Sequence, residues 1–503
     1  MLTAASEALS KIEVTASNSS IKNLWQEHGY ILPAFCLTIL VCAWFVTWGD
    51  WNFFAKEDFC DFYDAQARST LASRLDVPPA AIGTESFTFH GRTYGYFGIA
   101  PSLLRIPFVA AFGNMDGRWS HLMMLIASTI NLLCAYRFLQ LAAGSPRSSA
   151  HRMLNSLVIL CAGVGSTNVF LVARSFIFHE AIMWSATFGL LFALTTFKYL
   201  ARPRLGALCL SGLFAFMSLH SRATVGAGAL LGLAILSTTL VYRAITSSPD
   251  QDNFFGFGDV RKPWLQASVA TGLTVFIAMS YLAINYAKFH TFDGVPLKYY
   301  DFYVRNPIYL QMTGGRQIHL ENIPTAIASY LGFHPLWLSP MFPWIFPSRE
   351  ATFIGDPAIM VVEGFSTFPV SMPALFVLAL LGCRPLICDT DPTMRRLRIP
   401  VIAMFAGGAV MLATVAIAER YLHDFYPTLI ILAAIGVGRL VQQRYLGWAT
   451  IGVALLSVIS FTINSAFAIE NQRLDAWSMG GVPEAKRAEF KQTQKSIYRI
   501  LHR

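Results

Sequence analysis

Long apolar runs recur along the whole chain and limit it to folds that cross a membrane. A helix needs roughly 20 apolar residues to span the hydrocarbon core, and about eleven runs approach or exceed that length. Charged residues make up 13 % of the chain, about half the fraction found in soluble domains. The sequence therefore predicts an all-α polytopic membrane protein. The predicted spans are 31–49, 119–142, 154–173, 181–199, 205–220, 223–242, 265–286, 369–388, 399–417, 421–441 and 446–467.

The connections between these spans alternate in charge, and this alternation predicts the orientation of the chain. An excess of Lys and Arg marks the cytoplasmic side of a membrane protein. The short connections on the other side carry only Arg174, Arg222 and Arg420. The tail 1–30 is then cytoplasmic, and the carboxyl terminus is extracytoplasmic. The cations assigned to the cytoplasmic side are Arg137, Arg147, Arg152, Lys198, Arg202, Arg204, Arg243, Arg261, Lys262, Arg384, Arg395, Arg396, Arg398, Arg439 and Arg444.

Two long connections, 50–118 and 287–368, fall on the extracytoplasmic side and are the predicted outer loops. The first contains an apolar stretch, 94–113, that carries Arg105 in its middle. A charge facing lipid at this depth costs several kcal/mol, so we predict an interfacial helix here and not a further span. The second loop is rich in aromatic residues and proline, which suits the headgroup layer or the wall of a carbohydrate site.

The chain is expected to divide into the tail 1–30, one transmembrane domain over 31–467 and an extracytoplasmic tail, 468–503. The segment 484–503 has the pattern of a basic amphipathic helix that is solvated or lies on a membrane surface. The apolar residues predicted to face inward are Phe490, Ile497, Ile500 and Leu501.

Other classes of protein fit the sequence poorly. The net charge is +9, but the cations are spread among the connections between spans, which argues against nucleic-acid binding. Most of the eight cysteines lie in or beside apolar runs, so neither a disulfide framework nor a CxxC metal site is implied. The first apolar run lacks a small-residue cleavage site and is read as a retained span.

Acids are crowded into the stretch "EDFCDFYDAQARS" (57–69), shortly after the first predicted span. Asp58, Asp61 and Asp64 recur every three residues, so in a helix they would repel one another by a few tenths of a kcal/mol per pair. Pairing with Lys56 and Arg68 would offset this repulsion, as would a divalent cation such as Mg or Mn. A catalytic carboxylate cluster is the third explanation.

The order of these parts, together with four local motifs, resembles the GT-C superfamily of membrane glycosyltransferases over roughly residues 30 to 440. The likeness is to a bacterial branch that includes arabinofuranosyl- and mannosyltransferases. The motifs are "DFYDAQARSTLASRLDVP" (61–78), "GRTYGYFGIAPSLLRIPF" (91–108), "FHEAIMW" (178–184) and "ERYLHDFYP" (419–427).

The resemblance implies a GT-C fold and an inverting transfer of a sugar from a polyprenyl-phosphate carrier. The acceptor would be a cell-envelope glycan, lipid or protein at the outer face of a bacterial plasma membrane. In this superfamily an acid of the first outer loop takes the proton from the acceptor hydroxyl. That places Asp61 first among the candidates, followed by Asp64 and Asp58, with Asp50 behind them. Some members use a divalent metal, and the sequence leaves Mg or Mn open.

The leaving phosphate requires cations at the outer ends of spans, where guanidinium groups can bind phosphate oxygens in pairs. Arg222, Arg420 and Arg174 are the candidates. Arg420 has an alternative, since Asp424 follows four residues later and an ordinary helical ion pair would account for it. Glu180 could instead stabilise a helix amino terminus, and His423 could be a packing residue. The expected supporting residues are His179, Glu180, Glu419, Tyr421 and His423.

Three other functions are alternatives to a transferase of this kind. A polymerase or ligase that uses a lipid-diphosphate-linked glycan would need the same base and arginines. A flippase or transporter would carry ionisable residues near the centres of its spans, and these spans are largely free of them. A non-catalytic envelope assembly subunit would leave the acidic stretch unexplained.

Overall fold

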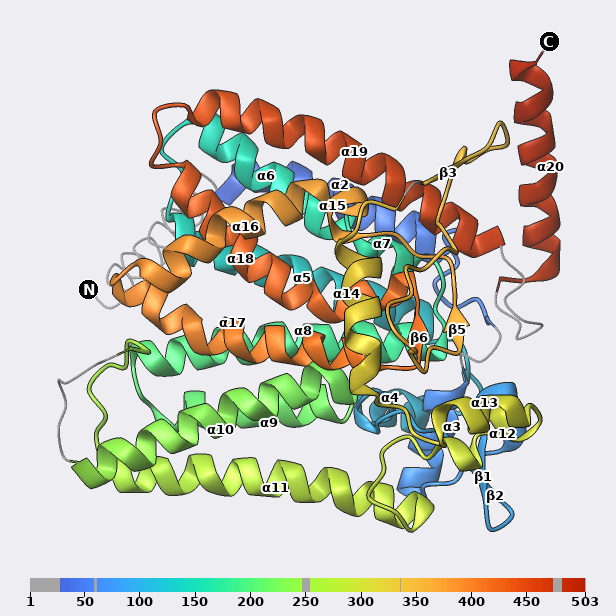
Figure 1. The fold of residues 1–503 in the computed structure, drawn as a ribbon, viewed down its shortest axis with the longest axis horizontal. Coiled ribbons are helices and arrows are strands. Elements are labelled where there is room, and N and C mark those ends of the chain that lie inside the picture. The colour runs from blue at the N-terminus through green and yellow to red at the C-terminus, as the bar shows by residue number, and fades with distance from the viewer. Residues whose placement is uncertain (1–27, 58–60, 247–253, 335, 474–481, 503) are drawn as a thin grey trace, which may run out of the picture.

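The computed structural model describes residues 28–57, 61–246, 254–334, 336–473 and 482–502. Long helices lie side by side across it, and most of the irregular chain gathers at one end of the bundle (Figure 1). Nine helical segments in these ranges are long and apolar enough to cross a membrane. The prediction of a helical, multi-pass membrane protein is confirmed.

The predicted spans all correspond to helices, although two helices, α9 and α16, are shorter than the other nine segments. The bundle helices are α2 (Leu32–Val46), α5 (Ser120–Ala143), α6 (Ser149–Gly163), α7 (Thr167–Val172), α8 (Ile177–Ala201), α9 (Leu205–Leu219), α10 (Ala223–Thr246), α11 (Pro263–Phe289), α16 (Pro373–Cys388), α17 (Pro392–Val410), α18 (Tyr426–Leu440) and α19 (Leu446–Arg473). The shorter helices are α3 (Phe62–Leu71), α4 (Ala100–Ala111), α12 (Asp301–Val304), α13 (Pro307–Thr313), α14 (Ile323–Leu331), α15 (Phe368–Ser371) and α20 (Glu484–Leu501).

Local sequence explains where the observed helices depart from the predicted boundaries. The span predicted over 154–173 is interrupted after Gly163, and the Ser166 side chain accepts a hydrogen bond from the Asn168 amide to start α7. The span predicted over 421–441 begins instead with a 3-10 helix, Glu419–Phe425, and α18 follows with proline in its first turn. Proline is tolerated there because the first turn leaves its amide groups unpaired.

Small residues let the bundle helices approach closely. In α16 and α18, a Cβ built on Gly436 would lie 2.0 Å from the carbonyl oxygen of Leu378, and one on Gly382 would lie 2.1 Å from that of Leu432. Any side chain at either position would push the two backbones apart. This small-residue contact is a common way for membrane helices to pack without a hydrophobic driving force between them.

The two long connections, 50–118 and 287–368, meet at one end of the bundle, which we call the loop end (Figure 1). Each contributes a short hairpin, and a parallel pair joins the second connection to the chain before α18. The strands are β1 (Phe87–Phe89), β2 (Arg92–Tyr94), β3 (Trp337–Leu338), β4 (Ile345–Phe346), β5 (Val361–Val362) and β6 (Ala416–Ile417).

The predicted interfacial helix over 94–113 is shorter in the structure, where α4 covers Ala100–Ala111. Its first predicted residue, Tyr94, instead pairs with Phe87 across the β1–β2 hairpin. Arg105 in α4 is fully buried inside the protein, which agrees with the expectation that its charge avoids lipid.

The carboxyl-terminal segment forms the predicted helix, α20, which runs across the direction of the long helices (Figure 1). The prediction that Ile500 and Leu501 face inward is wrong, because Ile500 is 71 % exposed and Leu501 is 59 % exposed. The earlier part of α20 meets the rest of the chain instead. Lys486 pairs with Asp50 at 2.6 Å, and the Phe490 ring centre lies 6.1 Å from that of Phe342.

Candidate active site

A cavity of about 570 Å³ opens at the loop end, between the two long connections and the ends of the bundle helices. Its wall combines aromatic rings with charged groups of both signs. The charged residues on the wall are Glu85, Arg174, Arg349, Glu363, Arg420 and Glu470. The aromatic residues are Phe87, Tyr96, Phe170, Phe176, Phe178, Tyr300, Phe302, Tyr303, Tyr421 and Phe467. Such a wall can bind an anionic group and an apolar ring face together.

Arg420 is held in a fixed position on the wall. Its guanidinium carbon lies 4.5 Å from the ring centre of Phe178 and 4.9 Å from that of Tyr421. One terminal nitrogen pairs with the carboxylate of Glu363, which lines the same cavity. The side chains of Arg420 and Glu363 remain 14 % and 28 % exposed. Planar stacking of this kind orients the guanidinium fork while donors remain for an anion.

Arg174 approaches the cavity from the chain just before α8. Its guanidinium carbon lies 4.2 Å from the Phe176 ring centre, and its Nε is 3.8 Å from a carboxylate oxygen of Glu57. The other oxygen of Glu57 accepts a hydrogen bond of 2.9 Å from the Ser175 amide. Glu57 opens the acidic stretch, so one acid of that stretch does reach a predicted phosphate-binding arginine.

Glu85 is the cavity-lining acid of the first long connection. It ends the short 3-10 helix Gly83–Glu85 and is 8 % exposed. Tyr300, from the second connection, lies on the same wall. Burial raises the pKa of Glu85 to about 7, while the Tyr300 hydroxyl and the charge of Arg420 oppose the rise.

The acids at 61 and 64 lie away from the cavity wall. Asp61 precedes α3 and forms an ion pair of 3.3 Å with Lys56, its side chain 28 % exposed. Asp64 is fully buried and accepts a hydrogen bond of 2.6 Å from the Gly117 amide. Asp58 lies outside the described residues. Among the described residues, Arg68 pairs with Asp116, at 2.6 and 2.8 Å, and with no acid of the stretch.

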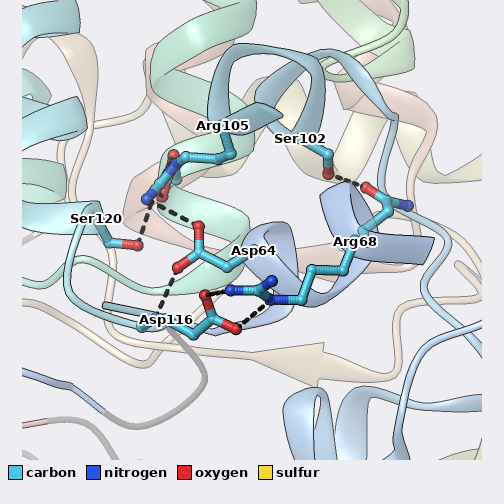
Figure 2. Close-up of polar contacts among 9 residues, drawn as sticks. Asp64, Arg68, Ser102, Arg105, Asp116 and Ser120 are labelled. Carbon is cyan, nitrogen blue, oxygen red and sulfur yellow. Dashed lines mark hydrogen bonds and ion pairs between the residues drawn. The ribbon is translucent and has the colours of Figure 1, made fainter. Parts of the chain in front are cut away.

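Asp64 belongs to a buried charged cluster built around Arg105 of α4. Figure 2 shows Arg105 and Asp64 pointing toward one another with Ser120 beside the guanidinium group. One terminal nitrogen of Arg105 donates to both carboxylate oxygens of Glu180 at 2.7 and 2.8 Å, and to Ser120 at 3.0 Å. The other nitrogen lies 3.4 Å from Asp64. Burial raises the pKa of Asp64 to about 6, although Arg105 opposes the rise.

The remaining predicted residues divide into two groups. His179 and Tyr421 line the cavity, as do Arg174 and Arg420, whereas Glu180 is bound to Arg105. Arg222 pairs with the buried Asp424 at 3.0 Å. The alternative of a helical pair between Arg420 and Asp424 is therefore wrong, since Arg420 pairs with Glu363.

Glu419 and His423 are buried beside the wall and not on it. A carboxylate oxygen of Glu419 accepts a hydrogen bond of 2.6 Å from the Ser366 amide. The His423 Nδ1 lies 2.9 Å from the Thr167 hydroxyl, and its ring stacks on Tyr426. These contacts fit the packing alternative for His423.

Sequence reasoning did not single out Glu85, Glu363, Arg349 or Tyr300. The acids at 57–64 form an obvious cluster, whereas Glu85 is a single acid in a stretch rich in aromatic residues. This isolation among aromatic residues is the sequence feature that distinguishes Glu85. Within the described ranges, no three His, Cys, Asp or Glu side chains converge as they would around a metal ion.

Comparisons with known proteins give similarity in structure only. No protein family model and no curated protein matches the sequence. The structure is similar to the oligosaccharyltransferase of Archaeoglobus fulgidus tethered with an acceptor peptide, at 11 % identity and a TM-score of 0.49 over 90 % of this chain. The same archaeal protein in complex with an inhibitory peptide and a dolichol-phosphate is 12 % identical to this chain. Its TM-score is 0.47, and the similarity covers 90 % of this chain. The chain covers 58 % and 59 % of those two chains.

A second protein, ArnT, is also similar to this chain in structure. ArnT from Cupriavidus metallidurans, bound to undecaprenyl phosphate, gives 10 % identity and a TM-score of 0.42. The similarity covers 88 % of this chain and 76 % of ArnT.

Proposed function

We propose that the chain transfers a sugar from a polyprenyl-phosphate carrier to an acceptor hydroxyl, at the extracytoplasmic face of a bacterial plasma membrane. The observation that carries this proposal is the loop-end cavity, where stacked arginines and aromatic rings line one wall. Three of the four motifs that resemble GT-C glycosyltransferases contribute residues to its wall, and these residues are Tyr96, Phe178, His179, Arg420 and Tyr421. Arabinofuranose and mannose are the sugars that the resemblance suggests.

In this proposal the donor phosphate binds Arg420 and Arg174. Each guanidinium group stacks on an aromatic ring and lies beside a carboxylate, which is Glu363 for Arg420 and Glu57 for Arg174. A phosphate that gains charge as the sugar leaves would be stabilised more in the transition state than in the ground state, which is the condition for acceleration. The aromatic wall supplies apolar faces for the sugar ring and the first isoprene units.

Lipid binding tests the donor part of the proposal. The full chain in nanodiscs is expected to bind radiolabelled undecaprenyl phosphate saturably and to bind undecaprenol, which lacks the phosphate, at least tenfold more weakly. The difference follows from charge-assisted hydrogen bonds to the arginines, at about 1.5–3 kcal/mol each. Equal binding of the two lipids would contradict a phosphate site.

The orientation is tested separately by cysteine labelling of cells in a cysteine-free background. Glu350→Cys, at the loop end, is expected to react with an impermeant maleimide added outside. Ser149→Cys, at the start of α6, is expected to react only after the membrane is opened. Both residues are exposed, so a reversed pattern reflects orientation and would place the cavity on the cytoplasmic side.

A further inference from the structure

We infer that Glu85 is the base that takes the proton from the acceptor hydroxyl, with Tyr300 beside it on the cavity wall. This inference rests on the proposed function and assigns a role that the resemblance gave to the acids at 58–64. Its starting point is that Glu85 lines the cavity, whereas Glu363 and Glu470 on the same wall are paired with arginines.

Three carboxyl groups lie among the described residues of the cavity wall, and the other two are bound to arginines. Glu363 pairs with Arg420, and Glu470 accepts a hydrogen bond of 2.7 Å from Arg473. A guanidinium partner stabilises the ionised form of a carboxyl group and so weakens it as a base. Glu85 retains more basicity because the side chain that most lowers its pKa, Tyr300, is uncharged.

The backbone around Glu85 is fixed by contacts between the two long connections. The Ser86 hydroxyl donates to the Asp301 carboxylate at 2.6 Å, and the Asp301 amide donates to the Ser86 carbonyl at 2.9 Å. The ring of Phe87 stacks on that of Tyr300 at 4.8 Å, nearly parallel. Ser86 and Asp301 directly follow Glu85 and Tyr300 in the sequence. These contacts therefore hold Glu85 and Tyr300 near one another.

The charge environment suits a proton acceptor near neutral pH. Burial raises the pKa of Glu85 to about 7, and Glu363 adds to the rise, whereas Tyr300 and Arg420 lower it. Tyr96 and Tyr303 also face the carboxyl group, and both hydroxyls are held in their protonated form by burial. A general base works best when its pKa is close to the operating pH.

In the proposed step, one bond to the anomeric carbon forms as another breaks, and one proton is transferred. The acceptor oxygen forms a bond to the anomeric carbon, and its proton moves to the Glu85 carboxylate. The bond between the anomeric carbon and the donor phosphate oxygen breaks, and its electron pair stays on the lipid phosphate beside Arg420. The sugar therefore changes carrier with inversion, and the proton leaves Glu85 to solvent before the next cycle.

The test compares release of undecaprenyl phosphate from a panel of undecaprenyl-phosphoryl pentoses and hexoses, with native membranes as the source of acceptor. Glu85→Gln is expected to lose 100- to 10,000-fold in turnover while binding undecaprenyl phosphate as the wild type does. Glu85→Asp, which keeps the carboxyl group, is expected to recover part of the activity and serves as the second variant if the amide does not fold.

The pH profile separates a base from a structural carboxylate. Wild-type turnover is expected to rise as the pH passes about 7, because the carboxylate must be ionised to accept a proton. Tyr300→Phe removes a hydroxyl group that lowers the pKa of Glu85, so the rise should move to higher pH. A structural role would lower turnover without moving the profile.

The outcomes distinguish this inference from the proposed function. Wild-type turnover and pH profile in Glu85→Gln, with a large loss in Asp61→Asn or Asp58→Asn, would return the base to the acidic stretch and overturn the role of Glu85. Absence of turnover in the wild type with every donor would overturn both proposals. Loss in Glu85→Gln with an unmoved profile in Tyr300→Phe would overturn the pairing with Tyr300.

Discussion

Arg105→Met is expected to lower the free energy of unfolding by about 3–5 kcal/mol, the usual result of removing one partner from a buried ion pair. The guanidinium group is fully buried and binds Glu180 through both carboxylate oxygens. Its loss leaves Glu180 and Asp64 as buried carboxyl groups without their cation. Thermal unfolding of the protein in detergent, followed by the exposure of buried cysteines, measures the change.

Arg68→Met is the matched control, because it removes the same chemical group a short distance away. Arg68 and its partner Asp116 are 41 % and 36 % exposed, and exposed ion pairs contribute only about 0–1 kcal/mol. Equal destabilisation by the two substitutions would contradict the special position of Arg105. The double change Arg105→Met with Glu180→Met should restore part of the loss, since it removes the unpaired charge.

Arg420→Ala is expected to reduce turnover by about 100- to 1,000-fold, comparable to the loss of one donor from a preorganised anion site. The protein should remain folded, because Arg420 and Glu363 both border the cavity and Glu363 can be solvated when its partner is removed. Turnover of an undecaprenyl-phosphoryl sugar and the dissociation constant of undecaprenyl phosphate are the two measurements.

Arg222→Ala provides the contrast. Its partner Asp424 is fully buried, and neither residue lines the cavity. The expected result is therefore a loss of stability with little direct effect on lipid binding. Wild-type turnover in Arg420→Ala would remove Arg420 from the phosphate site, and a folded but inactive Arg222→Ala would bring Arg222 into it.

The positions of the membrane helices were predictable because hydropathy is a local property, summed over about 20 residues. The ion pairs across the bundle could not be predicted in this way. Arg105 and Glu180 are 75 positions apart, and no periodic pattern connects them. The sequence could show that Arg105 avoids lipid but could not name the carboxylate that compensates its charge.

The alternative pairing of Arg420 with Asp424 fails for a more specific reason. It depends on α-helical spacing, which brings residues four apart to the same face. The segment Glu419–Phe425 is a 3-10 helix, in which residues three apart are aligned. Asp424 then turns toward Arg222, while Arg420 is left on the cavity wall with Glu363.

The contact between the two long connections has a consequence for biogenesis. Ser86 and its partner Asp301 are separated by 215 positions, and the helices from α5 to α11 lie between them in the chain. The ribosome therefore delivers many helices to the membrane before the surroundings of Glu85 can be completed. Because Asp301 follows α11, the contact with Ser86 forms late, and it cannot fix the backbone beside Glu85 in a nascent chain that ends before α11.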